Sequence, residues 1–187
     1  MRKYFLSISI LMSAMIALTA IIRAGQIQYF VPTNINFSSL SKPTQKQIEC
    51  LAENVYFEAG YESQKGKMAV ALVTLNRLSS GNYGNDICGV VHQKTNGTCQ
   101  FSWVCDKSFT DRRLTIKNTL LYNEIRNLAM SVVLNYENVT DITNGATYYH
   151  ADYVNPGWNL PMTIKIGSHI FYKSFRDVQT MRKELSI

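Results

Sequence analysis

The sequence predicts a mainly helical domain of the α+β class, with a small antiparallel sheet near its carboxyl terminus. Segments between residues 44 and 136 place apolar residues at helical spacing, whereas the residues beyond 144 change to alternating patterns broken by Asn-Gly and Pro-Gly turns. The chain has 187 residues, 46% of them hydrophobic and 17% charged. That composition excludes a disordered chain or a coiled coil and is sufficient for one packed core.

The amino-terminal segment has the pattern of an export signal. Arg2 and Lys3 precede an uncharged run over residues 5–22, and Arg23 follows it. The run is longer than the core of most cleaved signals and weakly apolar for a spanning helix, and its basic flank predicts that the rest of the chain is translocated. We expect residues 1–24 to be a retained signal-anchor, with a cleaved signal peptide as the alternative.

Residues 25–43 show no sustained periodicity and contain two prolines and many polar residues, which predicts a linker to a domain over residues 44–187. The first helix of that domain is expected after Thr44, which has the capping-box spacing to Gln47. Its apolar face comprises Ile48, Leu51, Ala52, Val55, Tyr56 and Ala59. Gly60 is expected to end this helix.

A second helix is predicted over residues 64–79, with Ser63 as its N-cap and Gly81 just after its end. Because this helix is apolar on most sides, it should be the central one. A short helix over 86–93, a loop over 94–108 and a long amphipathic helix over 111–136 are expected next. The apolar face of the long helix comprises Leu114, Leu121, Ile125, Leu128 and Val132.

Three strands are expected after the turn at Asn144-Gly145. They cover residues 146–151, 162–166 and 169–173, and Asn155-Pro156-Gly157 makes a turn between the first two. Gly167-Ser168 would join the last two as a type II′ hairpin, because a glycine at the first position of a two-residue loop suits that turn.

The four cysteines are an even set in a chain predicted to be exported, so disulfide bonds are expected. Cys99 and Cys105 are the nearest pair, and Cys50 with Cys88 is the simplest remaining pairing among the three possible connectivities. The CxxC spacing of a zinc site is absent, and we expect no metal. The chain also lacks HExxH, GxSxG, GxGxxG and P-loop motifs, so no cofactor is expected.

Glu58 is the strongest candidate for chemistry. On a helical wheel it falls at the edge of the buried stripe beside Leu51, whereas Glu53 points away from it. A carboxyl group in apolar surroundings has a raised pKa and keeps a proton near neutral pH, which is what a general acid for glycosidic bond cleavage requires. The alternative is a boundary glutamate in a surface salt bridge.

Aromatic residues in the predicted loops and turns are a second indication. Rings flanked by Ser, Asn, Gln and His are typical of grooves that stack on sugars, although each ring could instead pack in the core. These residues are Trp103, Tyr148, Tyr149, Tyr153 and Trp158.

Five blocks of sequence resemble the SleB-like cell-wall hydrolase family and occur in its order. They are CLAENVYFEAGYESQKGKMAVALVTLNR (50–77), DICGVVHQ (86–93), CQFSWVCD (99–106), GATYYHADYVNPGW (145–158) and IGSHIFYK (166–173). The resemblance implies a lysozyme-like, lytic-transglycosylase-type domain that acts on the glycan strands of peptidoglycan.

The resemblance also implies roles for single residues. The family's Tyr-x-Glu-Ala-Arg-Gly-Glu block corresponds to residues 56–62, which makes Glu58 the catalytic residue; Gly60-Tyr61 stand where the family has Arg-Gly. The residues implied to line or shape the substrate groove are Glu62, Gln100, Ser102, Trp103, Tyr148, His150 and Trp158.

The mechanism that follows is lytic transglycosylation, in which one carboxyl acts as acid and then as base. A hydrolytic muramidase that uses Asp152 or Asp141 as its second carboxylate is the nearest alternative. A non-catalytic, tethered peptidoglycan-binding module is an alternative of a different class. The weakly apolar anchor resembles that of phage signal-anchor endolysins, and a bacterial housekeeping enzyme fits almost as well.

The net charge of +6 falls to +3 without residues 1–24, because that segment holds three of the 19 basic residues and none of the 13 acidic ones. This charge is too small and too dispersed for nucleic-acid binding, but suits weak attraction to an anionic wall. The expected partners are peptidoglycan and, through the amino-terminal segment, the inner membrane. We expect a monomer whose domain lies in the periplasm.

Overall fold

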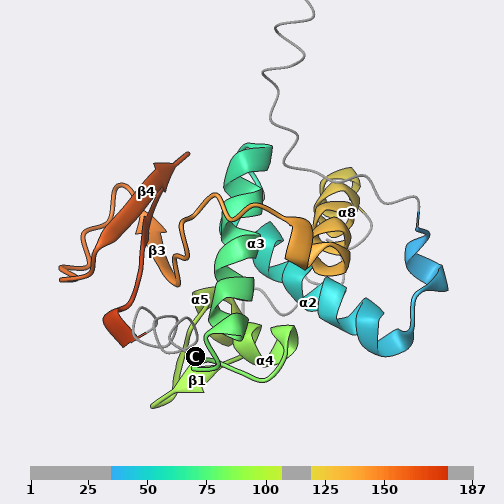
Figure 1. Ribbon diagram of the computed structural model, residues 1–187, viewed down its shortest axis with the longest axis horizontal. Helices are drawn as coiled ribbons and strands as arrows, with labels where there is room; N and C mark the ends of the chain where they lie inside the picture. Colours follow the sequence, from blue (N-terminus) through green and yellow to red (C-terminus); the bar gives the residue numbers. More distant parts are fainter. Residues whose placement is uncertain (1–34, 107–118, 177–187) are drawn as a thin grey trace, which may run out of the picture.

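The computed structural model describes residues 35–106 and 119–176 (Figure 1). The predicted signal-anchor over residues 1–24 lies outside these residues, as does Leu114 of the predicted long helix. Within the two described ranges, no helix has both the length and the apolar character needed to cross a membrane.

Three long helices form the core. They are α2 (Lys42–Ala59), α3 (Gln64–Ser79) and α8 (Leu120–Leu134). Helix α3 stands between the sheet and α8 in Figure 1, and all of its residues from Gly66 to Arg77 are buried. Ser63 caps it by accepting a hydrogen bond from the Gly66 amide. The prediction of a central second helix is therefore confirmed.

Helix α2 begins earlier than the sequence predicts. Ser41, and not Thr44, is the N-cap, and its Oγ accepts a hydrogen bond of 3.3 Å from the Thr44 amide. Pro43 lies in the first turn, where its missing amide hydrogen costs nothing. The predicted capping box at Thr44 is therefore wrong, because a serine three residues upstream fills the same role.

A short 3-10 helix, η1 (Phe37–Ser39), precedes α2 within the segment predicted as a linker. Phe37 and Leu40 pack against the main core cluster. The folded part thus includes residues before 44, because two partly buried apolar side chains there pack against the helices.

The predicted loop over 94–108 contains regular structure. Strands β1 (Lys94–Thr95) and β2 (Thr98–Cys99) form a small antiparallel hairpin, and α5 (Ser102–Cys105) follows. Asn96 and Gly97 join the strands with φ of 53° and 79°. An Asn-Gly pair suits a turn with two left-handed residues, so the sequence does carry a signal for this hairpin.

The carboxyl-terminal part is the predicted sheet. Strands β3 (Tyr148–Ala151), β4 (Met162–Ile166) and β5 (His169–Tyr172) are antiparallel in the order β3-β5-β4. The sheet packs on α3 through a cluster that joins Ala69 and Val73 to Ile166 and Phe171. The α+β class is confirmed.

Two disulfide bonds join the smaller elements to the core. Cys50–Cys88 links α2 to α4 (Ile87–Val91), and Cys99–Cys105 links β2 to the end of α5. A second 3-10 helix, η2 (Tyr136–Asn138), follows α8. The pairing matches the simplest of the three connectivities.

Candidate active site

Glu58 lies in the last turn of α2, where the helix meets the sheet. Its side chain is half-buried, and its Oε2 accepts a hydrogen bond of 2.9 Å from the Tyr149 hydroxyl of β3. Burial raises the pKa of Glu58, while the hydrogen bond from Tyr149 and the positive charge of Arg77 partly oppose that rise. The result is a carboxyl that holds its proton at higher pH than an exposed glutamate.

Tyr149 is fixed as the donor in this pair. Its ring packs edge-on against His169, with centroids 5.3 Å apart, and lies 5.7 Å from the ring of Phe171. Burial and the Glu58 carboxyl together raise the pKa of Tyr149 well above its ordinary value. The phenol therefore stays protonated and can hydrogen-bond to either form of Glu58.

Arg77 provides a buried positive charge that acts on Glu58. Its side chain is only 5% exposed, and its Nε donates a hydrogen bond of 2.7 Å to the carbonyl of Thr147, the residue just before β3. Its Nη1 is buried and makes no hydrogen bond within the described part of the chain. The guanidinium carbon lies 4.9 Å from the ring centroid of Phe101, 5.2 Å from that of Tyr83 and 5.7 Å from that of Tyr148.

Glu62 contacts the turn between β4 and β5. The Ser168 amide donates to its Oε1 at 3.4 Å, and His169 Nδ1 lies 3.9 Å from the same oxygen. A Cβ at Gly167 would overlap Oε2 of Glu62. Burial lowers the pKa of His169, and the carboxylates of Glu62 and Asp152 partly oppose this change. The geometry suits the site-shaping role expected for Glu62.

Three of the predicted groove residues lie together in the structure. His150 and Tyr148 have their ring centroids 5.5 Å and 5.6 Å from that of Trp158. His150 also stacks on Tyr172, with which it shares a hydrogen bond of 3.0 Å. Since side chains alternate along a strand, these rings lie on the opposite face of β3 from Tyr149.

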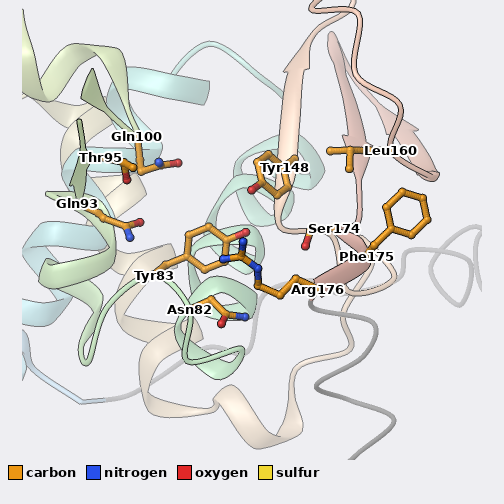
Figure 2. A pocket seen from close by; sticks show the side chains of 10 residues that line it. All are labelled: Asn82, Tyr83, Gln93, Thr95, Gln100, Tyr148, Leu160, Ser174, Phe175 and Arg176. Carbon is orange, nitrogen blue, oxygen red and sulfur yellow. The ribbon is translucent and has the colours of Figure 1, made fainter. Parts of the chain in front are cut away.

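Gln100 and Tyr148 line a pocket of about 350 Å³ between the β1–β2 hairpin and the sheet (Figure 2). Glu58 is not among the lining residues. Ser102 is exposed at the start of α5 and does not line the pocket. Apart from Ser102 and Trp103, the predicted groove residues thus divide between this pocket, the aromatic cluster and the turn held by Glu62.

Trp103 lies in the core. It is 2% exposed, its ring stacks on Phe57 with centroids 4.6 Å apart, and its Nε1 donates to Asn54 Oδ1 at 3.1 Å. An indole buried on this scale cannot offer a face to a sugar in this conformation. Trp103 therefore packs in the core, which is the alternative given above for each of these aromatic residues.

Both aspartates considered as a second carboxylate make polar contacts with other residues. Asp141 accepts hydrogen bonds from Asn76, Thr143 and the Gly145 amide, and so holds the turn before β3. Asp152 is exposed and forms an ion pair of 2.9 Å with Lys165, which lowers its pKa.

Sequence reasoning missed Arg77 and the hydrogen bond from Tyr149 to Glu58. The sequence does indicate a role for Arg77, because it is a charged residue near the end of a helix that is otherwise apolar on most sides. Tyr149 was singled out as an aromatic residue, but no pattern in the chain indicates which helix its strand faces.

Comparisons with known proteins agree on one family. The cell wall hydrolase family matches residues 61–172, a segment that begins three residues after Glu58. A spore cortex-lytic enzyme of Halalkalibacterium halodurans is 32% identical over 131 residues, which are 68% of this chain and 35% of that protein. One from Bacillus cereus is 31% identical over 137 residues, covering 70% of this chain and 45% of the relative. The matches thus span less than half the length of these relatives.

Two solved structures have folds similar to that of this chain. The catalytic domain of the germination-specific lytic transglycosylase SleB from Bacillus anthracis matches with a TM-score of 0.52 and 28% identity, covering 76% of this chain and all of that domain. The catalytic domain of Bacillus cereus SleB matches with a TM-score of 0.50 and 27% identity, covering 69% of this chain and 91% of that domain. The expectation of a lysozyme-like fold is confirmed by this similarity.

Proposed function

The chain belongs to the cell wall hydrolase family, and on this premise we propose that it cleaves the glycan strands of peptidoglycan by lytic transglycosylation, with Glu58 as acid and base. The observation that carries the proposal is the half-buried Glu58 carboxyl held by Tyr149. The description of the similar Bacillus anthracis domain as a lytic transglycosylase supports the reaction type.

In the first step, protonated Glu58 gives its proton to the glycosidic oxygen between N-acetylmuramic acid and N-acetylglucosamine. The bond from that oxygen to the muramic acid C1 breaks, and positive charge develops on the ring. Burial favours this step, because it keeps the proton on Glu58 until the leaving oxygen can accept it.

In the second step, ionised Glu58 takes the proton from the C6 hydroxyl of the same muramic acid. The C6 oxygen then bonds to C1 and closes a 1,6-anhydro ring, so that no water is consumed and Glu58 is again protonated. The positive charge of Arg77 favours the ionised form that this step needs.

The engagement of both aspartates supports a mechanism with one carboxyl. Most glycoside hydrolases use a second carboxylate to activate water or to act as nucleophile. Asp141 is committed to its turn and Asp152 to Lys165, so neither is a ready partner for Glu58.

We also propose that the domain acts outside the cytoplasm, tethered by residues 1–24 as a signal-anchor through the segment predicted as a linker, residues 25–43. The two disulfide bonds support an oxidising compartment. Fractionation of cells into membrane and soluble parts tests the anchor, since a cleaved signal would leave a shorter, soluble protein.

Glu58→Gln tests whether the proposed acid is used. Removal of a general acid should lower the rate of lysis of purified sacculi by at least about 100-fold. Glu53→Gln is the matched control on the same helix and should lyse sacculi at the parental rate. Lysis by Glu58→Gln at the parental rate would contradict the role of Glu58. If the folded parent fails to lyse sacculi but binds them, the chain is a binding module.

Mass spectrometry of the released muropeptides tests the reaction type. Lytic transglycosylation predicts 1,6-anhydro ends, whereas a hydrolytic muramidase produces reducing ends. Reducing ends as the main product would favour the hydrolase, and Asp152→Asn would then show whether that aspartate is the second carboxylate.

A further inference from the structure

His169, at the start of β5, is a buried titratable residue that takes no part in the two steps proposed above. It is 8% exposed, and its Nδ1 is buried without a hydrogen-bond partner among the described residues. A buried polar atom without a partner costs stability, whereas an apolar side chain of similar size would fill the same space without that cost. The unpaired nitrogen therefore points to a role beyond packing.

Glu62 faces this nitrogen. Its Oε1 lies 3.9 Å from His169 Nδ1, which is longer than a hydrogen bond, and the Ser168 amide donates to the same oxygen at 3.4 Å. Polar contacts of catalytic sites are often long in the free enzyme and shorten when substrate binds. Because an ionised carboxylate can only accept, it favours the form of the imidazole that carries its proton on Nδ1.

Two glycines leave space for the Glu62 carboxyl group. A Cβ at Gly66 of α3 would lie 2.8 Å from the Glu62 Cβ and 3.0 Å from its Oε2, and a Cβ at Gly167 would overlap Oε2. The Glu62 side chain is only 16% exposed. Helix α3 and the β4–β5 turn thus enclose the carboxyl group, which fixes it next to the imidazole.

His169 also contacts Tyr149, the hydrogen-bond donor to Glu58. The two rings are nearly perpendicular, at 87°, and their centroids are 5.3 Å apart. Tyr149 pairs with Phe171, two residues along β5 from His169, so the three rings lie on one face of the sheet. The contacts therefore run without a break from Glu62 through His169 and Tyr149 to Glu58.

We propose that His169, oriented by Glu62, is a positioning residue that holds the Tyr149 hydroxyl against Glu58. This inference rests on the proposed function, because Glu58 is the acid of that reaction. Without the imidazole, the Tyr149 ring has space to turn and its hydrogen bond to Glu58 weakens. That hydrogen bond stabilises the carboxylate that forms when Glu58 gives up its proton, so His169 acts on the reacting group without touching substrate.

Charged groups from several elements face His169. Burial lowers the pKa of His169, the carboxylates of Glu62 and Asp152 oppose this change, and His150 adds to it. Asp152 is itself paired with Lys165 at 2.9 Å. The imidazole is therefore neutral at pH 7, and it holds Tyr149 by its orientation and not by a charge. The pH dependence of the reaction remains that of Glu58.

The pKa of Glu58 provides a test that needs no turnover. It is measured by carbon NMR on the whole chain labelled at the glutamate carboxyl carbons, with Glu58→Gln to identify the signal. Tyr149→Phe should raise this pKa, because the lost hydrogen bond lowers it in the parent. His169→Ala should also raise it, and should add nothing in the Tyr149→Phe background. The matched control is His92→Ala, at an exposed histidine after α4, which should leave the pKa unchanged.

Glu62→Ala separates positioning from a direct effect of charge. Removal of a negative charge would by itself lower the pKa of Glu58, whereas release of Tyr149 raises it. We expect a rise. Nitrogen NMR of the His169 ring should show the proton on Nδ1 in the parent and its loss from Nδ1 in Glu62→Ala. This variant leaves the sheet intact, so the test does not depend on whether His169→Ala folds, which thermal unfolding shows.

Turnover gives a second measurement. On sacculi, Tyr149→Phe and His169→Ala should each lower kcat about tenfold, as expected for one lost hydrogen bond to a charged group. The double variant should also lose about tenfold, and not the roughly hundredfold loss of two independent effects. In each variant the alkaline limb of the pH–rate profile should move to higher pH, because Glu58 keeps its proton longer.

The inference is overturned if His169→Ala folds and leaves the pKa of Glu58 unchanged, since His169 would then only pack. A fall in that pKa in Glu62→Ala, a proton on Nε2 in the parent, or losses of kcat that multiply in the double variant would also overturn it. Lysis by Glu58→Gln at the parental rate would contradict the proposed function alone, because the NMR measurements do not depend on turnover.

Discussion

Burial and two neighbouring residues act in opposite directions on the pKa of Glu58, and their balance bears on its two proposed roles. Burial favours the protonated acid of the first step, while Tyr149 and Arg77 favour the carboxylate of the second. A group that only resisted ionisation would be a poor base, and a freely exposed carboxylate would be a poor acid near neutral pH. The surrounding residues therefore matter to the proposed reaction as much as the glutamate does.

Arg77→Gln should move the alkaline limb of the pH–rate profile to higher pH. Removal of the nearby positive charge destabilises ionised Glu58, which raises its pKa further, so that the acid stays protonated to higher pH. The lysis rate measured across pH checks this result. Arg77→Lys keeps the charge and should leave the limb near its parental position; an unchanged limb in Arg77→Gln would contradict the coupling.

Glu58→Gln should stabilise the fold at alkaline pH and not at acidic pH. Because the pKa of Glu58 is raised from its ordinary value of 4.5, the folded state of the parent loses stability as pH rises past that value towards the raised one. Glutamine has no such charge to bury. Thermal unfolding of both proteins at about pH 4 and pH 8 should show a gain in Tm only at the higher pH. An equal difference at both values would contradict this prediction.

The sequence allowed Glu58 to be predicted, because one helix supplies both the residue and the apolar stripe beside it. It did not allow the pKa partners to be predicted, since Tyr149 and Arg77 come from other elements. Trp103 shows the same limit: its place in a predicted loop left open whether the ring lines a groove or packs in the core, and Phe57 and Asn54 of α2 contact it there. Local periodicity reports which face of a helix is buried and not what covers it.

At the scale of elements, Glu62 joins the end of the α2–α3 turn to the β4–β5 turn. The contact leaves no space for a side chain at Gly167, whose φ is +56°. Gly97 also has a positive φ of +79°, but a Cβ there would meet nothing within 4 Å. Alanine substitutions at the two glycines can therefore be compared to measure how much folding stability is lost when a Cβ overlaps the Glu62 side chain.

Gly97→Ala should destabilise the fold by about 1–2 kcal/mol, which is the cost of a left-handed alanine. Gly167→Ala should cost about 1–3 kcal/mol more, because its Cβ also overlaps the Glu62 carboxyl. Chemical denaturation measures both values. Glu62→Ala in the Gly167→Ala background should recover part of the extra loss, and equal costs at the two glycines would show that Glu62 is free to move away.

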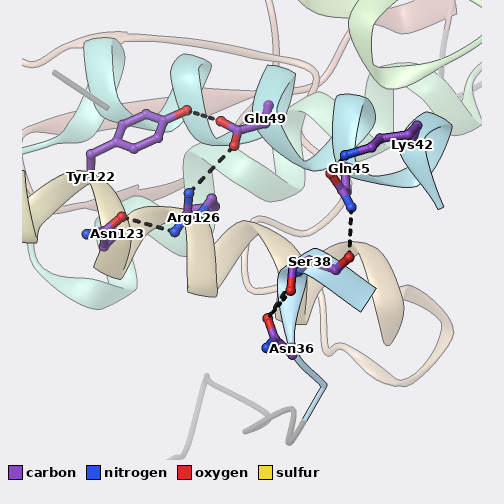
Figure 3. Close-up of polar contacts among 8 residues, drawn as sticks. All are labelled: Asn36, Ser38, Lys42, Gln45, Glu49, Tyr122, Asn123 and Arg126. Carbon is purple, nitrogen blue, oxygen red and sulfur yellow. Dashed lines mark hydrogen bonds and ion pairs between the residues drawn. The ribbon is translucent and has the colours of Figure 1, made fainter. Parts of the chain in front are cut away.

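Helices α2 and α8 are joined by polar contacts that no local pattern indicates (Figure 3). The Tyr122 hydroxyl donates to Glu49 Oε2 at 2.5 Å, and Arg126 lies 3.7 Å from Oε1 of the same carboxylate. Burial and this carboxylate raise the pKa of Tyr122, which stays a donor. Hydrophobic spacing predicted both helices, but the register between them depends on pairs more than 70 residues apart in the sequence.

At the scale of the whole molecule, the two disulfides should differ in their effect on stability. Cys50–Cys88 spans 38 residues and Cys99–Cys105 spans 6. Because a longer closed loop restricts the unfolded chain more, replacing the first pair by serine should cost about 3–4 kcal/mol and the second about 2 kcal/mol. Thermal unfolding of the two double variants checks the order. A larger loss from the Cys99–Cys105 pair would place the main effect in the folded state.

Strand β3 presents Tyr149 towards Glu58 and Tyr148 towards the pocket, which restricts how the protein can vary in evolution. A single-residue insertion or deletion just before this pair would exchange the directions of the two rings and disturb both places at once. The exposed segment over 153–157 is under no such constraint, because it lies between Asp152, which pairs with Lys165, and Trp158, which packs on Tyr148. Length changes among relatives should therefore gather in that connection and be absent from the residues leading into β3.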